Sequence, residues 1–280
     1  MSDGIVLLRQ EEWRLIDQSG FNPHFHALQS FAIDDTLCMS VGRGYSPPTA
    51  RAWVHPKTIV LGIQDTKLLG LHEGLAFLDD INYQSVVRNS GGLAVALDEG
   101  VLNISLIFPD TEKGININRG YDSMLSLIRL MFQDLEGEIV AREIVGSYCP
   151  GSYDLSIGGK KFAGISQRRI RKGIAVQIYL CVTGSGYERA EIVRNFYHHA
   201  KYDAPSKFVF PDVRPEVMAS LSELYGLDLT VQTVMLRFLN TLKTLSGKMY
   251  ASQLHGEELE WFQSYYDRMI ERNNKIYGKA

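Results

Sequence analysis

Cysteine is scarce in this 280-residue sequence, with three residues at positions 38, 149 and 181. They are odd in number and far apart, and no Cys-x-x-Cys or Cys–His spacing typical of a zinc site joins them. Few, scattered cysteines are typical of a protein from a reducing compartment. We therefore predict no zinc site, and each thiol has to be judged by its own surroundings.

Long apolar runs and an excess of positive charge are also missing. No stretch approaches the length of a membrane span, and the N-terminus meets polar residues at 10–12, too early for a signal peptide. The formal net charge of −3 argues against general binding of nucleic acid. With 45% hydrophobic and 22% charged residues, the sequence predicts a soluble cytoplasmic protein that binds neither nucleic acid nor membrane.

Several common catalytic motifs are absent as well. The sequence contains no Gly-x-Ser-x-Gly elbow and no His-Glu-x-x-His motif. The loop Gly184-Ser185-Gly186 lacks the third glycine of a nucleotide fingerprint, because Arg189 occupies that position. The pairs His24/His26 and His198/His199 have no convincing third ligand. We therefore predict no metal site.

The periodicity of apolar residues predicts an α+β fold: a mixed, largely antiparallel sheet flanked by helices, with a helical C-terminal segment. Strand-like runs are separated by turn signals, and Gly158-Gly159 predicts a two-residue hairpin. Asp98-Glu99-Gly100 predicts a second hairpin, between 85–97 and 101–108. Further strands are expected at 50–62 and 174–182, and helices at 27–42, 68–80, 120–136, 187–201 and over most of 214–272.

Cys149 is the leading candidate for chemistry. It lies in the loop Gly146-Ser147-Tyr148-Cys149-Pro150-Gly151, just before the Gly158-Gly159 hairpin. In that hairpin Ser156 faces Lys161, so the lysine shares a sheet face with Asp154. A nearby ammonium group favours the reactive thiolate, and the spacing permits a contact between Lys161 and the thiol without requiring it. A loop cysteine without function is the alternative, whereas Cys38 and Cys181 fall in apolar patterns and are expected in the core.

Two further segments have more than one interpretation. Adjacent glycines in Arg88-Asn89-Ser90-Gly91-Gly92-Leu93-Ala94 can aim backbone N–H groups at a ligand, or they can form a simple bend between strands. The stretch 160–172 carries six basic residues and no acidic one. It is either a solvated face or a docking patch for an acidic protein.

Taken together, these motifs resemble the biotin/lipoate protein ligase superfamily, and within it the octanoyltransferases. The resemblance covers about residues 27–200, and four segments carry it in the expected order: 52–62, the glycine signature 88–95, 103–106 and the lysine hairpin 154–164. It implies the catalytic fold shared with class II aminoacyl-tRNA synthetases and biotin/lipoate ligases. We expect a single domain over 1–280, with a catalytic core at 27–200 and a helical extension at 201–280 packed on it.

The resemblance also implies site residues. In the transferases that work through a thioester, a cysteine precedes the lysine hairpin, and Cys149 matches it. Cys149 would then carry the acyl group, and Lys161 would stabilise the thiolate and help to polarise the acyl carbonyl. The segment 86–97 is a plausible wall for the acyl tail. The expected substrate-binding residues are Arg88, Ser90, Gly91, Gly92, Ala163 and Gly164.

The function implied is transfer of an octanoyl group from the octanoyl-lysine of the glycine cleavage H protein. The acceptor would be the lysine of lipoyl domains in 2-oxoacid dehydrogenase E2 subunits, and no cofactor would be needed. Three alternatives stay open. The donor could be acyl carrier protein, the enzyme could be an ATP-dependent lipoate–protein ligase, or the chain could be a binding module without catalysis.

Overall fold

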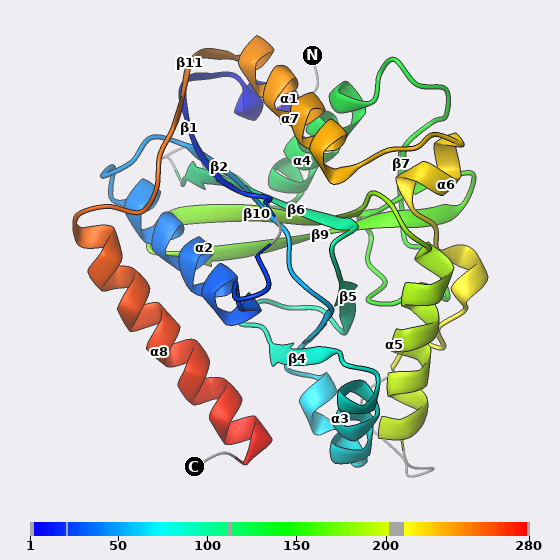
Figure 1. Ribbon diagram of the computed structural model, residues 1–280. Helices are drawn as coiled ribbons and strands as arrows, with labels where there is room; N and C mark the ends of the chain where they lie inside the picture. Colours follow the sequence, from blue (N-terminus) through cyan, green and yellow to red (C-terminus); the bar gives the residue numbers. More distant parts are fainter. Residues whose placement is uncertain (1–2, 21, 111–113, 202–209, 279–280) are drawn as a thin grey trace.

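A large mixed sheet forms the centre of the computed structural model, which describes residues 3–20, 22–110, 114–201 and 210–278. Its eight strands run in the order β11-β1-β2-β6-β10-β9-β8-β7. β1 pairs in parallel with β11 and β2, and the other neighbours are antiparallel. The α+β prediction is confirmed (Figure 1). The strands are β1 Gln10–Gln18, β2 Thr49–Trp53, β6 Val101–Pro109, β7 Val140–Ala141, β8 Asp154–Ile157, β9 Lys160–Ile170, β10 Gly173–Cys181 and β11 Ser246–Ala251.

A second, three-stranded sheet has the order β4-β3-β5, with β3 Thr58–Leu61, β4 Gln84–Val87 and β5 Val95–Leu97. β4 runs parallel to β3, and β5 runs antiparallel to it. The predicted hairpin across Asp98-Glu99-Gly100 is therefore wrong, because this turn leads from the small sheet into the large one. β5 and β6 follow each other in sequence, but their backbone partners come from elsewhere in the chain.

Eight α-helices cover the two sheets in the described part of the chain. The expected helix at 27–42 is confirmed with the same bounds, and those at 68–80, 120–136 and 187–201 are confirmed with small shifts. Among the described helices, none is both long and apolar enough to cross a membrane. The helices are α1 Asp3–Leu8, α2 Ala27–Gly42, α3 Leu71–Asp80, α4 Ile117–Met131, α5 Gly186–Ala200, α6 Leu221–Tyr225, α7 Val231–Leu245 and α8 Glu257–Tyr277.

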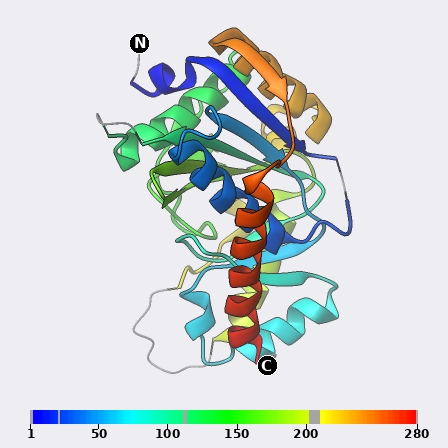
Figure 2. The same ribbon diagram turned by 90° about the vertical axis from the view of Figure 1, so that its left-hand side faces the viewer.

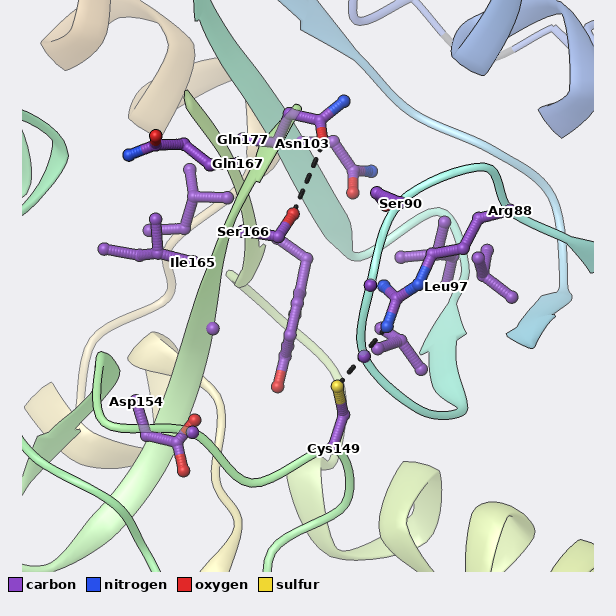
Figure 3. Close-up of a pocket in the computed structure, with 18 of the residues that line it drawn as sticks. Arg88, Ser90, Leu97, Asn103, Cys149, Asp154, Ile165, Ser166, Gln167 and Gln177 are labelled. Atoms are coloured by element: carbon purple, nitrogen blue, oxygen red, sulfur yellow. Dashed lines mark hydrogen bonds between the residues drawn. The ribbon is translucent and has the colours of Figure 1, made fainter. Parts of the chain in front are cut away.

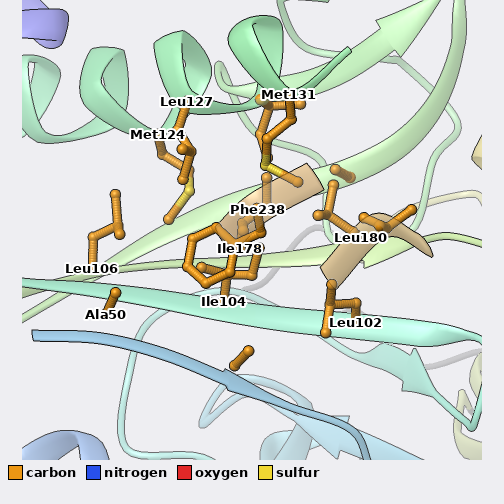
Figure 4. Close-up of a cluster of buried hydrophobic side chains, with 14 of the residues drawn as sticks. Ala50, Leu102, Ile104, Leu106, Met124, Leu127, Met131, Ile178, Leu180 and Phe238 are labelled. Atoms are coloured by element: carbon orange, nitrogen blue, oxygen red, sulfur yellow. The ribbon is translucent and has the colours of Figure 1, made fainter. Parts of the chain in front are cut away.

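The large sheet is covered on both faces, which explains why β6 is buried along almost its whole length. On one face, side chains of α4 and of α7 pack over Ile104 and Leu106 (Figure 4). On the other face, α2 packs on Ile107, and its Cys38 is fully buried there, as predicted. Full burial of each such aliphatic side chain contributes about 1.5–3 kcal/mol. The large sheet is therefore a rigid support for the side chains and loops at the ends of its strands.

The C-terminal segment departs from the helical prediction at β11, which pairs with β1 at the edge of the large sheet. This strand, which contains Gly247, lies inside the segment 214–272 that was expected to be mostly helical. A strand so far from its partner in sequence forms only through tertiary contact, so local periodicity misses it. Beyond β11, α8 runs beside α2 (Figure 2). Near its start the buried Glu258 accepts hydrogen bonds from Arg14 and Ser40.

Candidate active site

A pocket of about 300 Å³ lies where the large sheet, the small sheet and the Cys149 loop meet (Figure 3). Strands β9 and β10 contribute one side, and the glycine signature with β5 contributes another. The lining is mostly apolar, with polar groups at a few points. It includes Phe31, Trp53, Arg88, Ser90, Gly91, Gly92, Val95, Leu97, Tyr121, Cys149, Gly164, Ile165, Gln177, Ile178 and Tyr179.

The thiol of Cys149 is held at this pocket by two hydrogen-bond donors. Nη2 of Arg88 lies 3.4 Å from the sulfur (Figure 3), and the backbone N–H of Leu93 lies 3.1 Å from it. Cys149 has a φ of +45°, in the left-handed region that residues with a side chain seldom adopt. The sulfur therefore has two hydrogen-bond donors beside it, and one of them belongs to a positively charged side chain.

Arg88 is nearly buried, at 8% exposure, and forms no ion pair within the described residues. Its Nη2 also donates to the carbonyl of Leu93 at 2.8 Å, whereas its Nε is buried without a partner there. A buried guanidinium without a carboxylate is costly unless it meets another negative charge. Its Nη2 contacts the sulfur of Cys149, and the carboxyl group of Asp65 lies close enough for the two charges to interact. The sequence predicted that Arg88 binds substrate, but its contact with the thiol was not anticipated.

The second glycine of the signature is required by this contact. Gly92 has a φ of +104°, and a Cβ there would overlap Nη2 of Arg88 and lie 3.0 Å from the sulfur of Cys149. A side chain at position 92 would therefore displace the guanidinium or the thiol. Ser90 and Gly91 line the pocket beside it, and their predicted binding of substrate stays a prediction.

Lys161 occupies a different place from the one expected. The predicted register is confirmed, since Ser156 faces Lys161 across the hairpin. However, its ammonium is fully buried and donates to the carbonyls of Tyr148 at 2.9 Å and Cys149 at 3.0 Å. Among the described residues no hydrogen bond joins this ammonium to the sulfur, so the predicted action of Lys161 on the thiol stays a prediction. What the structure shows is that Lys161 binds the backbone of the cysteine loop.

A buried ion pair anchors that loop. Nζ of Lys161 lies 2.8 Å from Oδ1 of Asp154, and Oδ2 of Asp154 accepts from the backbone N–H of Ile144 at 3.1 Å. Burial raises the pKa of Asp154, and the charge of Lys161 opposes that shift. Lys161 and Asp154 together tie the lysine hairpin to the segment before Cys149. We infer that they hold the strained backbone of Cys149 in place.

The remaining predicted residues divide between the pocket and the core. Gly164 lines the pocket, whereas Ala163 is fully buried in the main hydrophobic core. Cys181 is buried, as predicted, and lies 3.8 Å from the hydroxyl of Tyr148.

These motifs and this fold agree with comparisons against known proteins. Residues 26–243 match the family model of the lipoyl protein ligase A/B catalytic domain. The chain belongs to this family. A protein of Bacillus velezensis named octanoyl-[GcvH]:protein N-octanoyltransferase is 61% identical over 276 residues, covering 98% of this chain and 96% of that protein.

One further sequence relative and one solved structure are informative. A protein of Listeria monocytogenes named lipoyl-[GcvH]:protein N-lipoyltransferase is 53% identical over 271 residues, covering 97% of this chain and 98% of that protein. The crystal structure of a lipoate-protein ligase A bound with ATP superposes with a TM-score of 0.67 at 15% identity, covering 92% of this chain and 95% of that one. The structural likeness confirms the predicted fold.

The basic run 160–172 is less uniform in this family member than its sequence indicated. Lys161 pairs with Asp154, Arg168 with Asp35 and Arg169 with Asp110. Three basic residues of the run are exposed and form no ion pair within the described part, namely Lys160, Arg171 and Lys172. The acidic partners come from distant segments of the chain. The sequence of the run alone therefore overestimated the number of basic side chains free to form a positive patch. A docking role for it stays a prediction.

Proposed function

We propose that this protein transfers an octanoyl group from the lysine of a glycine cleavage H protein to a lysine of another carrier protein, through a thioester on Cys149. Lipoyl domains of 2-oxoacid dehydrogenase E2 subunits are the proposed acceptors. The observation that carries the proposal is the thiol of Cys149, which faces an apolar pocket and accepts hydrogen bonds from Leu93 and Arg88. The name of the Bacillus velezensis relative supports octanoyl as the acyl group and GcvH as the donor.

In the first step, the sulfur attacks the amide carbonyl of octanoyl-lysine. A C–S bond forms, the C–N bond breaks, and the released lysine amine takes up the proton that the thiol gives up. Negative charge develops on the carbonyl oxygen during the attack. The N–H of Leu93, which faces the sulfur at 3.1 Å in the free enzyme, is the donor best placed to stabilise that charge.

In the second step, an unprotonated lysine amine of the acceptor attacks the thioester. A C–N bond forms and the C–S bond breaks, and the leaving sulfur beside Arg88 takes up the proton that the attacking amine loses. Exchanging an amide for a thioester is uphill, so the second step draws the first one forward. The enzyme is restored without any other reagent.

The pocket beside Cys149 suits a saturated chain. Phe31, Val95, Leu97 and Ile178 contribute apolar surface to it. Each methylene group that leaves water contributes about 0.8 kcal/mol. The binding free energy of an octanoyl tail therefore grows with the number of its methylene groups in the pocket. The carbonyl group at the end of the tail then lies at the sulfur.

Mass spectrometry of the intact protein tests the proposal. The protein is incubated with octanoylated H protein, with octanoylated acyl carrier protein, or with ATP and octanoate. We expect an octanoyl adduct on Cys149 from H protein, sensitive to hydroxylamine and lost in Cys149→Ala. Cys181→Ala is the matched control, because that buried thiol should not affect the adduct.

Each other outcome points to a different enzyme. An adduct from acyl carrier protein alone would assign the donor to that carrier. An acyl-adenylate formed with ATP, together with a Cys149→Ala variant of normal activity, would identify a ligase and overturn the thioester. No adduct and no transfer from any donor would indicate a binding module.

Lipoyl transfer is a second candidate, favoured by the name of the Listeria monocytogenes relative at 53% identity. A competition between octanoylated and lipoylated H protein distinguishes the two. Equal amounts of both donors are mixed with the enzyme and an unmodified lipoyl domain. The ratio of octanoylated to lipoylated product gives the preference directly, and an excess of lipoyl product would reverse our assignment.

A further inference from the structure

The peptide that carries the Leu93 donor is held by a chain of hydrogen bonds leading away from the pocket. The N–H of Ala94 donates to the hydroxyl of Tyr197 at 3.2 Å, and that hydroxyl donates to Oδ1 of Asp65 at 2.8 Å. Oδ2 of Asp65 accepts from the N–H of Gly62 at 2.8 Å. The carbonyl of Leu93 is held separately, by Arg88.

We propose that Asp65, acting through Tyr197, is a positioning residue that keeps the Leu93 N–H aimed at the sulfur of Cys149. This inference rests on the proposed thioester function and deepens it. Asp65 and Tyr197 are absent from the pocket lining among the described residues, so they act through the Leu93–Ala94 peptide. They therefore influence the thiol without touching a substrate.

The polar groups of this hydrogen-bond chain are buried, and burying polar groups costs free energy of folding. Asp65 is fully buried, Tyr197 is 2% exposed, and Asp65 forms no ion pair within the described part of the chain. A buried carboxyl group without a cation is expensive unless hydrogen bonds satisfy it. Here the N–H of Gly62 and the hydroxyl of Tyr197 donate to it, and the charge of Arg88, which belongs to the glycine signature, also acts on it.

The chemistry of the pair determines the direction of the hydrogen bonds. Burial raises the pKa of Asp65 to about 6, and the hydrogen bonds from Gly62 and Tyr197 oppose the shift. The pKa of Tyr197 is raised well above its ordinary value, mainly by burial, so it stays a phenol. At neutral pH the carboxylate can only accept. The Tyr197 hydroxyl must then donate to Asp65, which leaves its oxygen free to accept from Ala94.

The second carboxylate oxygen of Asp65 also affects the glycine signature, through Gly62. Its Oδ2 holds the N–H of Gly62, and a Cβ on Gly62 would collide with the carbonyl oxygen of Gly92. The backbone at Gly62 therefore packs directly against the residue that precedes Leu93. A shift of Asp65 would release both contacts of this short segment. The two contacts together fix the direction of the Leu93 N–H.

Tyr197→Phe is the sharpest variant, because it removes only a hydroxyl group and keeps the ring contacts with Phe196 and Phe210. The primary measurement is the rate at which iodoacetamide alkylates Cys149 at neutral pH, with the site located by peptide mass spectrometry. This rate reports thiolate formation and needs no acyl donor. Tyr265→Phe is the matched control, since Tyr265 is a buried phenol on α8 that contacts α2.

We expect alkylation to slow about 10-fold in Tyr197→Phe, the size of effect for misplacing one donor at a reacting atom. Acyl transfer should lose kcat by a similar factor, with KM for the octanoylated donor almost unchanged. Asp65→Asn should have the same effect. If the amide oxygen of the new asparagine accepts from Tyr197, its NH2 group faces the N–H of Gly62, and two donors cannot hydrogen-bond to each other. Tyr265→Phe should alkylate at the wild-type rate.

A second readout is the infrared stretch of a ¹³C-labelled octanoyl thioester on Cys149. Weaker hydrogen bonding to the carbonyl in Tyr197→Phe should shift the band to higher frequency. Folded Tyr197→Phe and Asp65→Asn proteins with wild-type alkylation rates would overturn the inference, whatever their transfer activity. Slow alkylation in a protein that accepts no octanoyl group would keep the positioning role and reject the proposed function.

Discussion

The side-chain amide of Asn273 hydrogen-bonds to both backbone polar groups of Val87, the residue immediately before Arg88. The N–H of Val87 lies 2.8 Å from Oδ1, and Nδ2 lies 3.1 Å from the carbonyl oxygen. Val87 ends β4, which is an edge strand of the small sheet. The amide thus occupies the place of a neighbouring strand. Helix α8 lies outside the matched residues 26–243 and still supports the site.

Replacing Asn273 by Ala should weaken this support. The two backbone groups of Val87 would lose their partners in a buried place, at a cost of about 1–3 kcal/mol. We expect a lower urea midpoint and slower alkylation of Cys149, because Arg88 follows directly. Asn274→Ala is the control, since Asn274 is the exposed neighbour on the same helix. Equal midpoints and rates for the two variants would contradict the supporting role of α8.

Arg88→Met should leave the thiol without its positive neighbour. Because Nη2 of Arg88 contacts both the sulfur and the Leu93 carbonyl, we expect formation of the thioester to fall by about 100-fold. Arg88→Lys should retain part of the rate, since an ammonium keeps the charge but lacks the planar fork. Rapid-quench mass spectrometry measures the step. A folded Met variant with wild-type kinetics would show that Arg88 does not act on the sulfur.

The main effect of Lys161→Met should be a lower free energy of unfolding. The substitution leaves the buried carboxyl of Asp154 without its cation, which costs about 3–5 kcal/mol in urea unfolding. Combining Lys161→Met with Asp154→Asn should restore part of that stability without restoring transfer, because the carbonyl of Cys149 still lacks its donor. If the double variant regained transfer activity, the backbone of Cys149 would not depend on Lys161.

The stability of the protein should fall with decreasing pH partly through His55. Burial lowers its pKa from 6.5 to about 3, so the unfolded chain takes up a proton near pH 6.5 that the folded protein refuses. The contribution is fully present above about pH 6.5 and is lost as the pH falls toward 3. Between pH 6 and pH 4 it amounts to about 2–3 kcal/mol.

Urea unfolding at pH 7, 6, 5 and 4 measures this contribution. His55→Gln should give a shallower loss of stability over this range than the wild type. His198→Gln, at an exposed position of α5, should follow the wild-type curve. Parallel curves for His55→Gln and the wild type would show that His55 is not protonated on unfolding.

Local sequence predicted the parts of the site that depend on spacing along the chain. The Gly158-Gly159 turn places Lys161 opposite Ser156, and the helix at 27–42 was predicted from its own residues with the observed bounds. Both depend on residues close in sequence. The glycine signature and Cys149 were likewise recognisable as motifs, because each is a short run with a fixed order of residue types.

Partners far apart in sequence were not predictable in the same way. Arg88 meets Cys149 across 61 positions, and Lys161 reaches a carbonyl although the spacing equally permitted the sulfur. The Leu93 donor has no sequence signal at all, because every residue except proline carries a backbone N–H. The partner of β5 and the strand β11 were missed because pairing is decided between distant segments.

The sequence by itself determined the family, the α+β class and the residues able to carry the chemistry. These properties follow from composition, periodicity and short motifs, which are local. Only the tertiary structure decided which positive group faces the thiol, which one holds the loop, and that Asp65 and Asn273 support the site from outside the pocket. The physical reason is that a hydrogen bond or an ion pair depends on distances of about 3 Å. Such distances between remote residues exist only after the chain has packed.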